Sequence, residues 1–541
     1  MMRVSRHPAL GAFALLVLLT LAGTWPQGLY LRSQVAAHHD PRFSMWRLAW
    51  IAHALRTDPR HLFDANIFYP ETRTLAYSDA TLLEGAIAAP MLWAGVAPIL
   101  VYNVLLLGGI AASGFGMFVL ARYLTGSSGA ALVSAVVFML APYRLEHYMH
   151  LELQWSMWIP LAFWAVHRAV DEESWKFGML AGVFVWLQTL SCVYYGFFLA
   201  LMAAALAMLL LATDIRHSRA ALRGLVLGAI VAAALIWPYA GPYLENAHVL
   251  GPRDPAEIAR YSARPINYLA SPPQNWLWGW TADRFGANET RLFPGAVAML
   301  LALCASAFRP RRSVWVYAGI CALAVELSFG VNGWLYGWLY AHAGALHGLR
   351  APARFAILVS SALAVMAGLG VAALDRLRGA RGPRMSAAAI ALALLALEYV
   401  PSRMFLMELA SGPPDVYTVI SGMGAGVVAE LPMPTPGRLP GYDAVYVSWS
   451  ATHWHRLVNG YSGYYPHSYF DTIQQMQTFP DDASIDRLTT LGVRYIVVHE
   501  AFYEPADHAA LLERMLARRQ LKPTGRYRDP AGQAELFELT R

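Results

Sequence analysis

Cysteine and charge are both scarce in this sequence. Its 541 residues include 3 cysteines, and Cys192, Cys304 and Cys321 all lie inside apolar segments, so the sequence predicts neither a disulfide framework nor a CxxC metal site. Charged residues make up 14% of the chain and hydrophobic residues 57%. Soluble domains average about 25% charged residues. This composition indicates a protein that is solvated mainly by lipid.

Familiar catalytic motifs are missing as well. The sequence contains no phosphate-binding P-loop, no HExxH metal site and no nucleophile motif. No repeat or long low-complexity segment is evident, which argues against a solenoid and against an obvious two-half transporter. The net charge of +6 does not indicate nucleic-acid binding, because the arginines cluster in short links between apolar segments.

Long apolar segments dominate the chain. A spanning helix needs about 20 mainly apolar residues, and this criterion gives about eleven candidates. They cover residues 9–29, 98–120, 127–142, 153–168, 177–191, 194–212, 221–238, 293–308, 314–329, 355–374 and 386–401. With the N-terminus inside, each predicted inner link is short and basic, as the positive-inside rule requires. The basic residues of these links are Arg122, Arg168, Lys176, Arg216, Arg219, Arg223, Arg309, Arg311, Arg312, Arg376, Arg378, Arg381 and Arg384.

These segments predict an α-helical polytopic membrane protein with its N-terminus inside and its C-terminus outside. Residues 1–401 would form the transmembrane domain, with an acidic first outer loop (30–97) and a long outer loop (239–292). Residues 402–541 change character and predict a small extracytoplasmic α/β domain. Its expected strands are 426–431, 444–448, 494–499 and a pair within 525–539, and its expected helices are 467–477, 483–491 and 505–519.

Asp40, at the start of the first outer loop, is the predicted catalytic residue. It follows the first apolar segment and precedes an amphipathic run in which Phe43, Trp46 and Trp50 recur at helical spacing, which predicts a helix in the membrane interface. An ionised carboxylate there can accept a proton from an acceptor hydroxyl. Alternatively, Asp40 caps the helix electrostatically. The two roles can coexist.

His150 and Glu152 lie in the outer link that follows residues 127–142. In an extended segment, side chains two positions apart share one face, so this pair is the predicted site for a divalent cation such as Mg²⁺ or Mn²⁺. The pair would alternatively bind a phosphosugar through hydrogen bonds. A polar collar at a helix end is the third interpretation, and the sequence does not separate the three.

Arg350 and Arg354 stand at the outer entrance to segment 355–374, where they break the positive-inside pattern. Arginine presents a planar fork of donors that suits phosphate, so both are predicted to bind the phosphate of a substrate. Headgroup anchoring or a salt bridge to the acidic loop is the alternative. Asp79 and Glu84 are second-choice substrate ligands, or a second-choice base or metal ligand.

The arrangement resembles the GT-C superfamily of membrane glycosyltransferases, which use polyprenyl-phosphate-linked sugars. That resemblance implies a catalytic aspartate early in the first outer loop, at Asp40, and metal ligands where His150-Leu151-Glu152 stands. The tail, with Glu430-Leu431-Pro432, Asn459-Gly460-Tyr461 and Leu491-Gly492-Val493-Arg494-Tyr495, is similar to that of bacterial proteins loosely near the YfhO-like branch. An acidic pair at the first-loop site is absent, since His39 precedes Asp40.

We therefore expect a glycosyltransferase of the bacterial inner membrane that moves a sugar from a polyprenyl-phosphate-type donor to a glycan, lipid or protein acceptor on the outer face. Half of its site would come from the later outer links. Two alternatives are a transporter or lipid flippase and a non-catalytic envelope scaffold. Transport predicts ionisable groups paired at mid-membrane, whereas this sequence places them at the outer boundary.

Overall fold

The computed structural model describes residues 6–213, 218–308, 312–342, 344–378, 386–402, 404–409, 412–530 and 532–540. Of the predicted inner-link arginines, Arg216, Arg309, Arg311, Arg381 and Arg384 lie outside the described residues. The chain divides into two compact units. The bundle unit comprises Met1–Leu31, Asn103–Gly241 and Gly251–Leu406. The sheet unit comprises Arg32–Tyr102, Pro242–Leu250 and Met407–Arg541.

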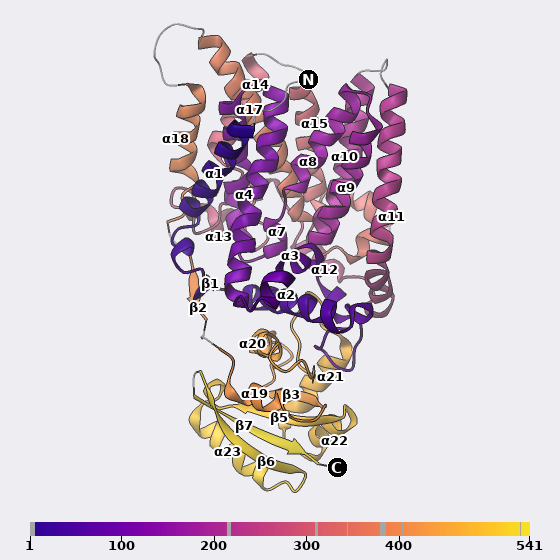
Figure 1. Ribbon diagram of the computed structural model, residues 1–541, viewed down its shortest axis with the longest axis vertical. Coiled ribbons are helices and arrows are strands. Elements are labelled where there is room, and N and C mark those ends of the chain that lie inside the picture. The colour runs from indigo at the N-terminus through magenta and orange to yellow at the C-terminus, as the bar shows by residue number, and fades with distance from the viewer. Residues whose placement is uncertain are drawn as a thin grey trace. The chain divides into compact units, whose positions relative to one another are not determined.

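Helices make up the bundle unit, in which α4, α8, α9 and α10 run alongside one another (Figure 1). Helices α4 and α11 each contribute residues to both units. The longer helices are α1 (Arg6–Gly23), α4 (Pro98–Thr125), α5 (Ser128–Leu140), α8 (Trp158–Asp171), α9 (Trp175–Ser191), α10 (Val193–Thr213), α11 (Ser218–Leu250), α14 (Ala296–Phe308), α15 (Arg312–Ser328), α17 (Ala356–Arg378) and α18 (Ala387–Tyr399). Short helices connect them: α6 (Pro142–Glu146), α7 (Leu151–Gln154), α12 (Pro255–Arg260), α13 (Ala282–Phe285), α16 (Trp334–His342) and the 3₁₀ turn η9 (Pro352–Phe355).

Every apolar segment predicted from the sequence coincides with one of these helices, so their helical character is confirmed. Among the described residues, five helical stretches are long and apolar enough to cross a membrane. They are Pro98–Thr125, Ser128–Glu146, Val193–Ala212, Arg219–Leu250 and Pro352–Leu377. The number of spans and their direction stay predictions.

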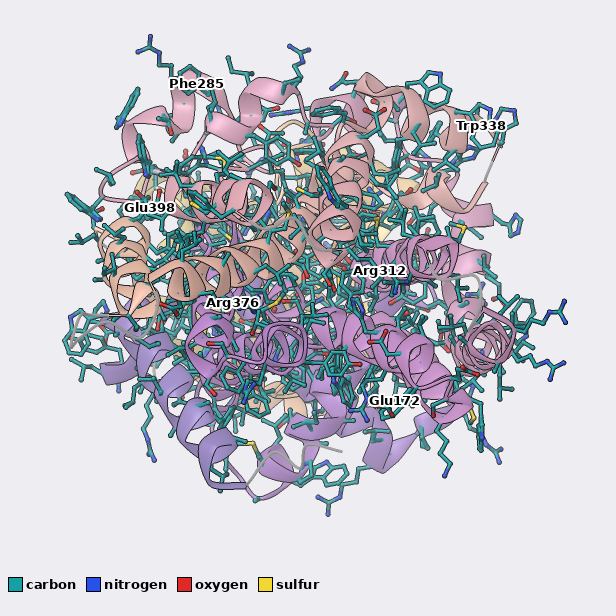
Figure 2. The ribbon with its side chains drawn as sticks, turned by 90° about the horizontal axis from the view of Figure 1, so that it is seen from above. Glu172, Phe285, Arg312, Trp338, Arg376 and Glu398 are labelled. Carbon is teal, nitrogen blue, oxygen red and sulfur yellow. The ribbon has the colours of Figure 1, made fainter. Side chains whose placement is uncertain are left out.

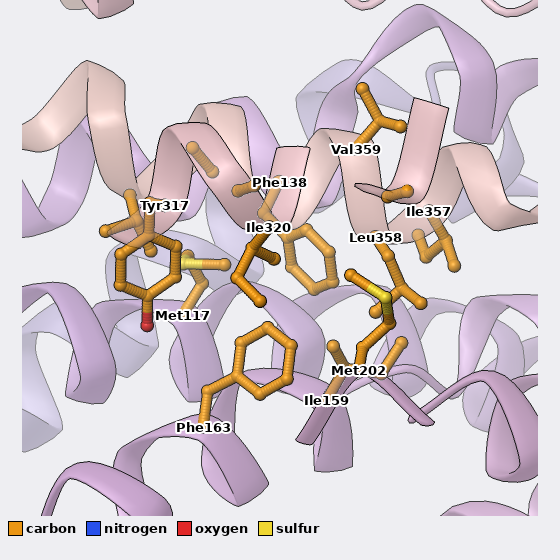
Figure 3. Close-up of a cluster of buried hydrophobic side chains, with 14 of the residues drawn as sticks. Met117, Phe138, Ile159, Phe163, Met202, Tyr317, Ile320, Ile357, Leu358 and Val359 are labelled. Carbon is orange, nitrogen blue, oxygen red and sulfur yellow. The ribbon is translucent and has the colours of Figure 1, made fainter. Parts of the chain in front are cut away.

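Large apolar side chains from distant helices fill the centre of the bundle unit (Figure 3). Phe163 of α8, Met202 of α10 and Leu358 of α17 are all completely buried there. Because lipid is as apolar as these side chains, close van der Waals packing rather than escape from water holds such helices together. The core therefore depends on the shapes of its side chains.

Glycines allow α9 and α11 to approach backbone to backbone. Gly178 and Gly182 on α9 face Gly224 and Gly228 on α11, so both helices carry a GxxxG spacing at the contact. A Cβ added at Gly182 would lie 2.0 Å from the carbonyl oxygen of Gly228, which is sterically impossible. Small residues at this spacing are a recurrent means of helix association in membranes.

Glu398, which Figure 2 labels, lies near the end of α18 and satisfies the first N–H groups of another helix. Its carboxylate accepts hydrogen bonds from the backbone N–H groups of Ala296 and Val297, at 2.6 and 3.0 Å, and from the indole of Trp278 at 2.9 Å. The first N–H groups of a helix have no partner within the helix, and an acid at this end is favourable. Glu398 thus caps α14 rather than standing alone.

The sheet unit contains a five-stranded mixed sheet with strand order β4-β3-β5-β7-β6. Strand β3 pairs in parallel with β4 and β5, whereas β7 is antiparallel to β5 and β6. The strands are β3 (Val427–Leu431), β4 (Arg456–Leu457), β5 (Val493–His499), β6 (Leu521–Asp529) and β7 (Gly532–Leu539), and a short pair joins β1 (Gln34–Ala36) to β2 (Leu406–Glu408). The helices of this unit are α2 (Asp40–Thr57), α3 (Leu82–Trp93), α19 (Asp415–Ser421), α20 (Asp443–Ser450), α21 (His467–Gln475), α22 (Asp482–Thr490) and α23 (Pro505–Leu516).

The strand expected at residues 444–448 is wrong, because this segment forms α20. Its buried positions include Asp443, Ala444, Val447 and Ser450, which recur at spacings of three and four. That is the period of a helix with one buried face, and a strand would bury every second residue. Over five residues the two patterns are difficult to separate in the sequence.

Candidate functional site

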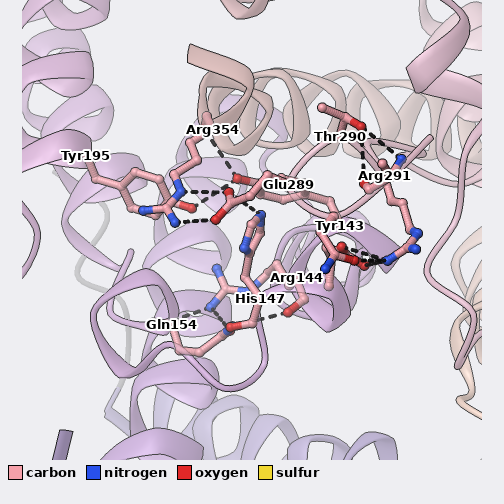
Figure 4. A network of polar contacts seen from close by, with 12 residues as sticks. Tyr143, Arg144, His147, Gln154, Tyr195, Glu289, Thr290, Arg291 and Arg354 are labelled. Carbon is pink, nitrogen blue, oxygen red and sulfur yellow. Dashed lines mark hydrogen bonds and ion pairs between the residues drawn. The ribbon is translucent and has the colours of Figure 1, made fainter. Parts of the chain in front are cut away.

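Arg354 and Glu289 form a two-pronged ion pair in the bundle unit (Figure 4). The Nε of Arg354 donates to Oε2 of Glu289 at 2.9 Å, and its NH2 nitrogen donates to Oε1 at 2.5 Å. Their side chains are 6% and 13% exposed. Burial opposes ionisation of Glu289, but the Arg354 guanidinium overcomes it and holds the pKa of this carboxyl far below its usual range. The pair is therefore charged on both sides at neutral pH.

His147, between α6 and α7, lies beside this pair with its Nε2 at 4.0 Å from Oε2 of Glu289. Burial lowers the pKa of His147 to about 3, because a charged ring would lose its hydration there. The positive charge of Arg354 nearby lowers it further. His147 is accordingly neutral at pH 7, and its contact with Glu289 is not a second ion pair. The ring of His150 lies 5.6 Å from that of His147, measured between centroids.

Arg144 of α6 fixes the backbone of the same link. Its NH2 nitrogen donates to the backbone and side-chain oxygens of Gln154, and its NH1 nitrogen donates to the hydroxyl of Ser156. Gln154 in turn donates to the carbonyls of Arg144 and His147, at 3.2 and 2.8 Å. The link that carries His150 and Glu152 is thus a buried, hydrogen-bonded structure. This arrangement matches the polar-collar interpretation of the segment.

Arg350 differs sharply from Arg354, although only four positions separate them. Its side chain is 29% exposed, and its guanidinium lies over the ring of Tyr261 and comes within 3.8 Å of Glu257. At that length the pair with Glu257 is loose and is not a hydrogen bond. Arg350 therefore keeps donors available for an incoming anion, whereas the fork of Arg354 is engaged by Glu289.

Asp40 is the first residue of α2 in the sheet unit, with His39 in the N-cap position. The hydroxyl of Tyr461 donates to its Oδ1 at 2.5 Å, and Nδ1 of His38 lies 3.3 Å from its Oδ2. The carboxylate remains 17% exposed. A partly buried base that is fixed by a tyrosine and retains access to solvent is suited to accept a proton. Its place in the first turn also fits the helix-dipole role.

The aromatic face of α2 does not match the expectation of an interfacial helix. Phe43, Trp46 and Trp50 are buried within the sheet unit. The ring of Phe43 packs edge-on against Tyr461 at 5.3 Å, and that of Trp50 packs edge-on against Trp454 at 5.6 Å. An amphipathic period shows only that one face is covered, and here other protein residues cover it.

Asp79 and Glu84 are both buried in the sheet unit. The backbone carbonyl of Asp79 accepts a hydrogen bond from the guanidinium of Arg47 on α2, which itself is 1% exposed. Glu84 lies in the first turn of α3 and has no exposed surface, so it suits the dipole of that helix. The structure brings Asp40, Asp79 and Glu84 into one compact unit and places His150, Glu152, Arg350 and Arg354 in the other.

A divalent cation remains a proposal for His150 and Glu152. Among the described residues, no three histidine, cysteine or acidic side chains form a group that would hold a metal ion. The pair would supply two ligands at most, a number compatible with Mg²⁺, which retains several waters.

Two participants, Glu289 and Tyr461, were missed by the sequence reasoning. Glu289 was detectable in principle, because two arginines in a predicted outer link call for a counter-charge. The alternative salt bridge predicted for them is to the acidic first loop instead. Tyr461 belongs to the run Asn459-Gly460-Tyr461, which the sequence indicates as part of the tail resemblance and as a Gly/Tyr-rich turn, not as a partner of Asp40. Nothing in the sequence pairs it with a residue 421 positions away.

Comparison with known proteins identifies the fold. No family model matches the chain, and no curated protein matches it. Among solved structures, the oligosaccharyltransferase AglB from Archaeoglobus fulgidus, in complex with an inhibitory peptide and a dolichol-phosphate, matches with a TM-score of 0.52 and 15% identity over 98% of this chain and 74% of that one. The mycobacterial arabinofuranosyltransferase AftD matches with a TM-score of 0.61 and 16% identity over 100% of this chain and 42% of that one.

Both neighbours are GT-C superfamily membrane glycosyltransferases, so this chain has the GT-C fold, as the resemblance predicted. Its apolar helices, five of which among the described residues are long enough to cross a membrane, indicate a multi-pass membrane protein. The chain spans less than half the length of AftD. Sequence identities this low establish the fold alone, and the YfhO-like branch stays a prediction.

Proposed function

We propose that the protein is a glycosyltransferase of the bacterial inner membrane, which transfers a sugar from a polyprenyl-phosphate-type donor to an envelope acceptor on the outer face. Residues 1–401 would form its membrane domain and residues 402–541 its extracytoplasmic domain. The fold that the chain shares with two membrane glycosyltransferases supports its assignment to the glycosyltransferases. The observation that carries the proposal is Asp40, a partly exposed carboxylate at the head of α2 that Tyr461 holds in place.

In this proposal Asp40 is the general base. It accepts the proton of the acceptor hydroxyl as that oxygen forms its bond to the anomeric carbon of the sugar. The bond between that carbon and the phosphate oxygen of the donor breaks, and the lipid phosphate departs with the electron pair. The hydroxyl of Tyr461 fixes Oδ1 of this carboxylate, which orients the group for proton transfer.

In the bundle unit, we propose that Arg350 stabilises the charge of the departing phosphate. Preorganised cationic donors contribute most where charge develops in the transition state. The guanidinium of Arg354 is paired with Glu289, so Arg354 is proposed as a positioning residue that fixes the start of α17. His150 and Glu152 would orient the phosphosugar through hydrogen bonds or through a divalent cation, and Asp79 and Glu84 remain second-choice substrate ligands.

The proposal is tested in a deletion strain by mass spectrometry of its envelope glycans. We expect deletion to remove one sugar from an envelope glycan, and the wild-type gene to restore it. An Asp40→Asn variant should reach the membrane at the wild-type level and restore nothing, because the amide cannot accept the proton. Restoration by this variant, or an unchanged glycan profile in the deletion strain, would contradict the assignment.

A further inference from the structure

A cavity of about 420 Å³ lies in the sheet unit, at the C-terminal ends of α2 and α3. Two tryptophans form its walls. The indole N–H of Trp93 donates to the carbonyl of Ala52 at 2.9 Å, and the ring of Trp454 stacks on His53 with 4.5 Å between centroids. Contacts within the protein therefore hold both tryptophan rings in place. We call this cavity the α2–α3 pocket, and its lining includes Ala52, His53, Arg56, Leu92, Trp93 and Trp454.

Arg56 gives the pocket its charge. Arg56 is exposed, and no carboxylate of the described residues lies within ion-pair distance of it. The acid nearest to it along the chain, Asp58, pairs with His61 at 2.8 Å. No acidic side chain lines the pocket. Burial lowers the pKa of His53, so that ring is neutral at pH 7 and Arg56 is the pocket's cation. Apolar walls beside one unpaired guanidinium suit a ligand with an anionic group and an apolar part.

The outer face of α3 continues from the pocket as an apolar surface. Ile87 and Trp93 are 43% and 48% exposed, and Pro90 between them is exposed as well. Helix α3 ends at Trp93, and α4, which is long and apolar enough to cross a membrane, begins at Pro98. The four residues between them reach at most about 14 Å, at 3.3–3.6 Å per residue. The pocket therefore lies close along the chain to the start of a helix that is long and apolar enough to cross a membrane.

We propose that the α2–α3 pocket binds the phosphate headgroup of an anionic bilayer lipid. Arg56 pairs with the phosphate, which it can contact with two parallel donors. Trp93 lies at the boundary between headgroup and acyl chains, the position that tryptophan prefers in membrane proteins. Arg56 follows Asp40 by sixteen positions on one helix, which corresponds to about 24 Å at 1.5 Å per residue. This site is thus separate from the proposed base and does not depend on the proposed function.

The test is native mass spectrometry of the full-length protein in detergent, with phosphatidylglycerol or phosphatidylcholine added at equal concentration. We expect the wild-type chain to retain phosphatidylglycerol preferentially, and Arg56→Gln to reduce that retention about fivefold, the effect of one basic residue at a membrane surface. Arg60→Gln is the matched control, because Arg60 is exposed on the same segment but does not line the pocket. It should retain the lipid as the wild type does.

Equal retention of the two lipids by the wild type would overturn the proposal, as would equal losses in both variants. A further measurement distinguishes the source of the phosphate. Millimolar glycerol 3-phosphate should leave the bound phosphatidylglycerol in place, because it lacks the acyl chains that contact Trp93. Complete displacement would show that the pocket binds soluble phosphates instead. Both substitutions are at exposed arginines, where effects on folding are small.

Discussion

Tyr461 donates its hydroxyl to Asp40 at 2.5 Å, although the two residues are 421 positions apart in the sequence. The bond connects the head of α2 to a loop that follows β4, within one compact unit. Phe43, one turn along α2, packs edge-on against the same tyrosine ring. Tyr461 therefore sets both the position and the environment of the proposed base.

Replacing Tyr461 with phenylalanine should impair transfer without unfolding the protein. Loss of the donor removes a hydrogen bond that favours the ionised carboxylate, worth about 1.5–3 kcal/mol for a charged group. We expect the acidic limb of the pH–rate profile to move to higher pH by about 1–2 units. Tyr465→Phe, four positions along the same loop, should leave the limb unchanged. A profile that is identical in wild type and Tyr461→Phe would show that the bond has no part in catalysis.

Arg354 and Arg350 should differ in their effect on stability. Arg354→Gln leaves Glu289 charged and buried, which typically costs about 3–5 kcal/mol. Arg350→Gln breaks only a loose, partly exposed pair with Glu257, worth about 0–1 kcal/mol. Thermal unfolding in detergent should therefore show a large loss for the first variant and little change for the second.

The same ion pair can be examined with a double substitution. Glu289→Gln alone should destabilise as Arg354→Gln does, and the combined variant should lose less than the sum, because neither charge is then left unpaired. Additive losses would mean that the two side chains act independently, contrary to the two hydrogen bonds between them.

The glycine contact between α9 and α11 gives a prediction about packing. Gly182→Ala places a methyl group 2.0 Å from the carbonyl oxygen of Gly228, so the helices must separate. Overpacking of this kind typically costs about 1–3 kcal/mol. Gly108→Ala is the matched control, since an added Cβ there meets nothing within 4 Å. Its folded yield and thermal stability should equal or exceed those of the wild type, and similar losses in both variants would contradict the packing argument.

His499 predicts a pH dependence of the sheet unit. It is buried between Asp529, at 2.7 Å from Nδ1, and Glu430, at 2.9 Å from Nε2. Burial alone would lower the pKa of His499, but its bonds to these two carboxylates raise it to about 9. Because the folded-state pKa exceeds the unfolded value of about 6.5, the stabilisation is complete below pH 6.5 and is lost as the pH rises through 9, by up to about 3 kcal/mol.

Hydrogen–deuterium exchange of β5 peptides, corrected for the intrinsic exchange rate, would follow this loss between about pH 6.5 and 9.5. His499→Gln should flatten the pH dependence and lower the protection at pH 7, since it leaves two buried carboxylates without their cation. Among the described residues, His508 forms an ion pair with one acid, Glu535 at 3.1 Å, so His508→Gln should keep the slope. A slope retained in His499→Gln would assign the dependence to other groups.

Local sequence patterns were sufficient for the long apolar helices and for most strands of the five-stranded sheet, but not for α20. The apolar segments mark helices because apolar length alone is decisive in a membrane. Strand β5 is recognisable from its β-branched apolar residues, which are Val493, Ile496, Val497 and Val498. Patterns within a few residues do not report long-range pairing. The partner of Arg354 is 65 positions upstream, and only the folded bundle shows that it is Glu289.

The position of Asp40 at the head of α2 also sets a rule for recognising relatives of this chain. One residue inserted between Asp40 and Trp50 would turn the carboxylate by about 100° relative to the aromatic face that packs on Tyr461. Proteins that keep this arrangement should therefore preserve the spacing Asp-x2-Phe-x2-Trp-x3-Trp, with an Asn-Gly-Tyr run far downstream. Such a discontinuous signature would retrieve relatives whose overall identity is too low for ordinary alignment.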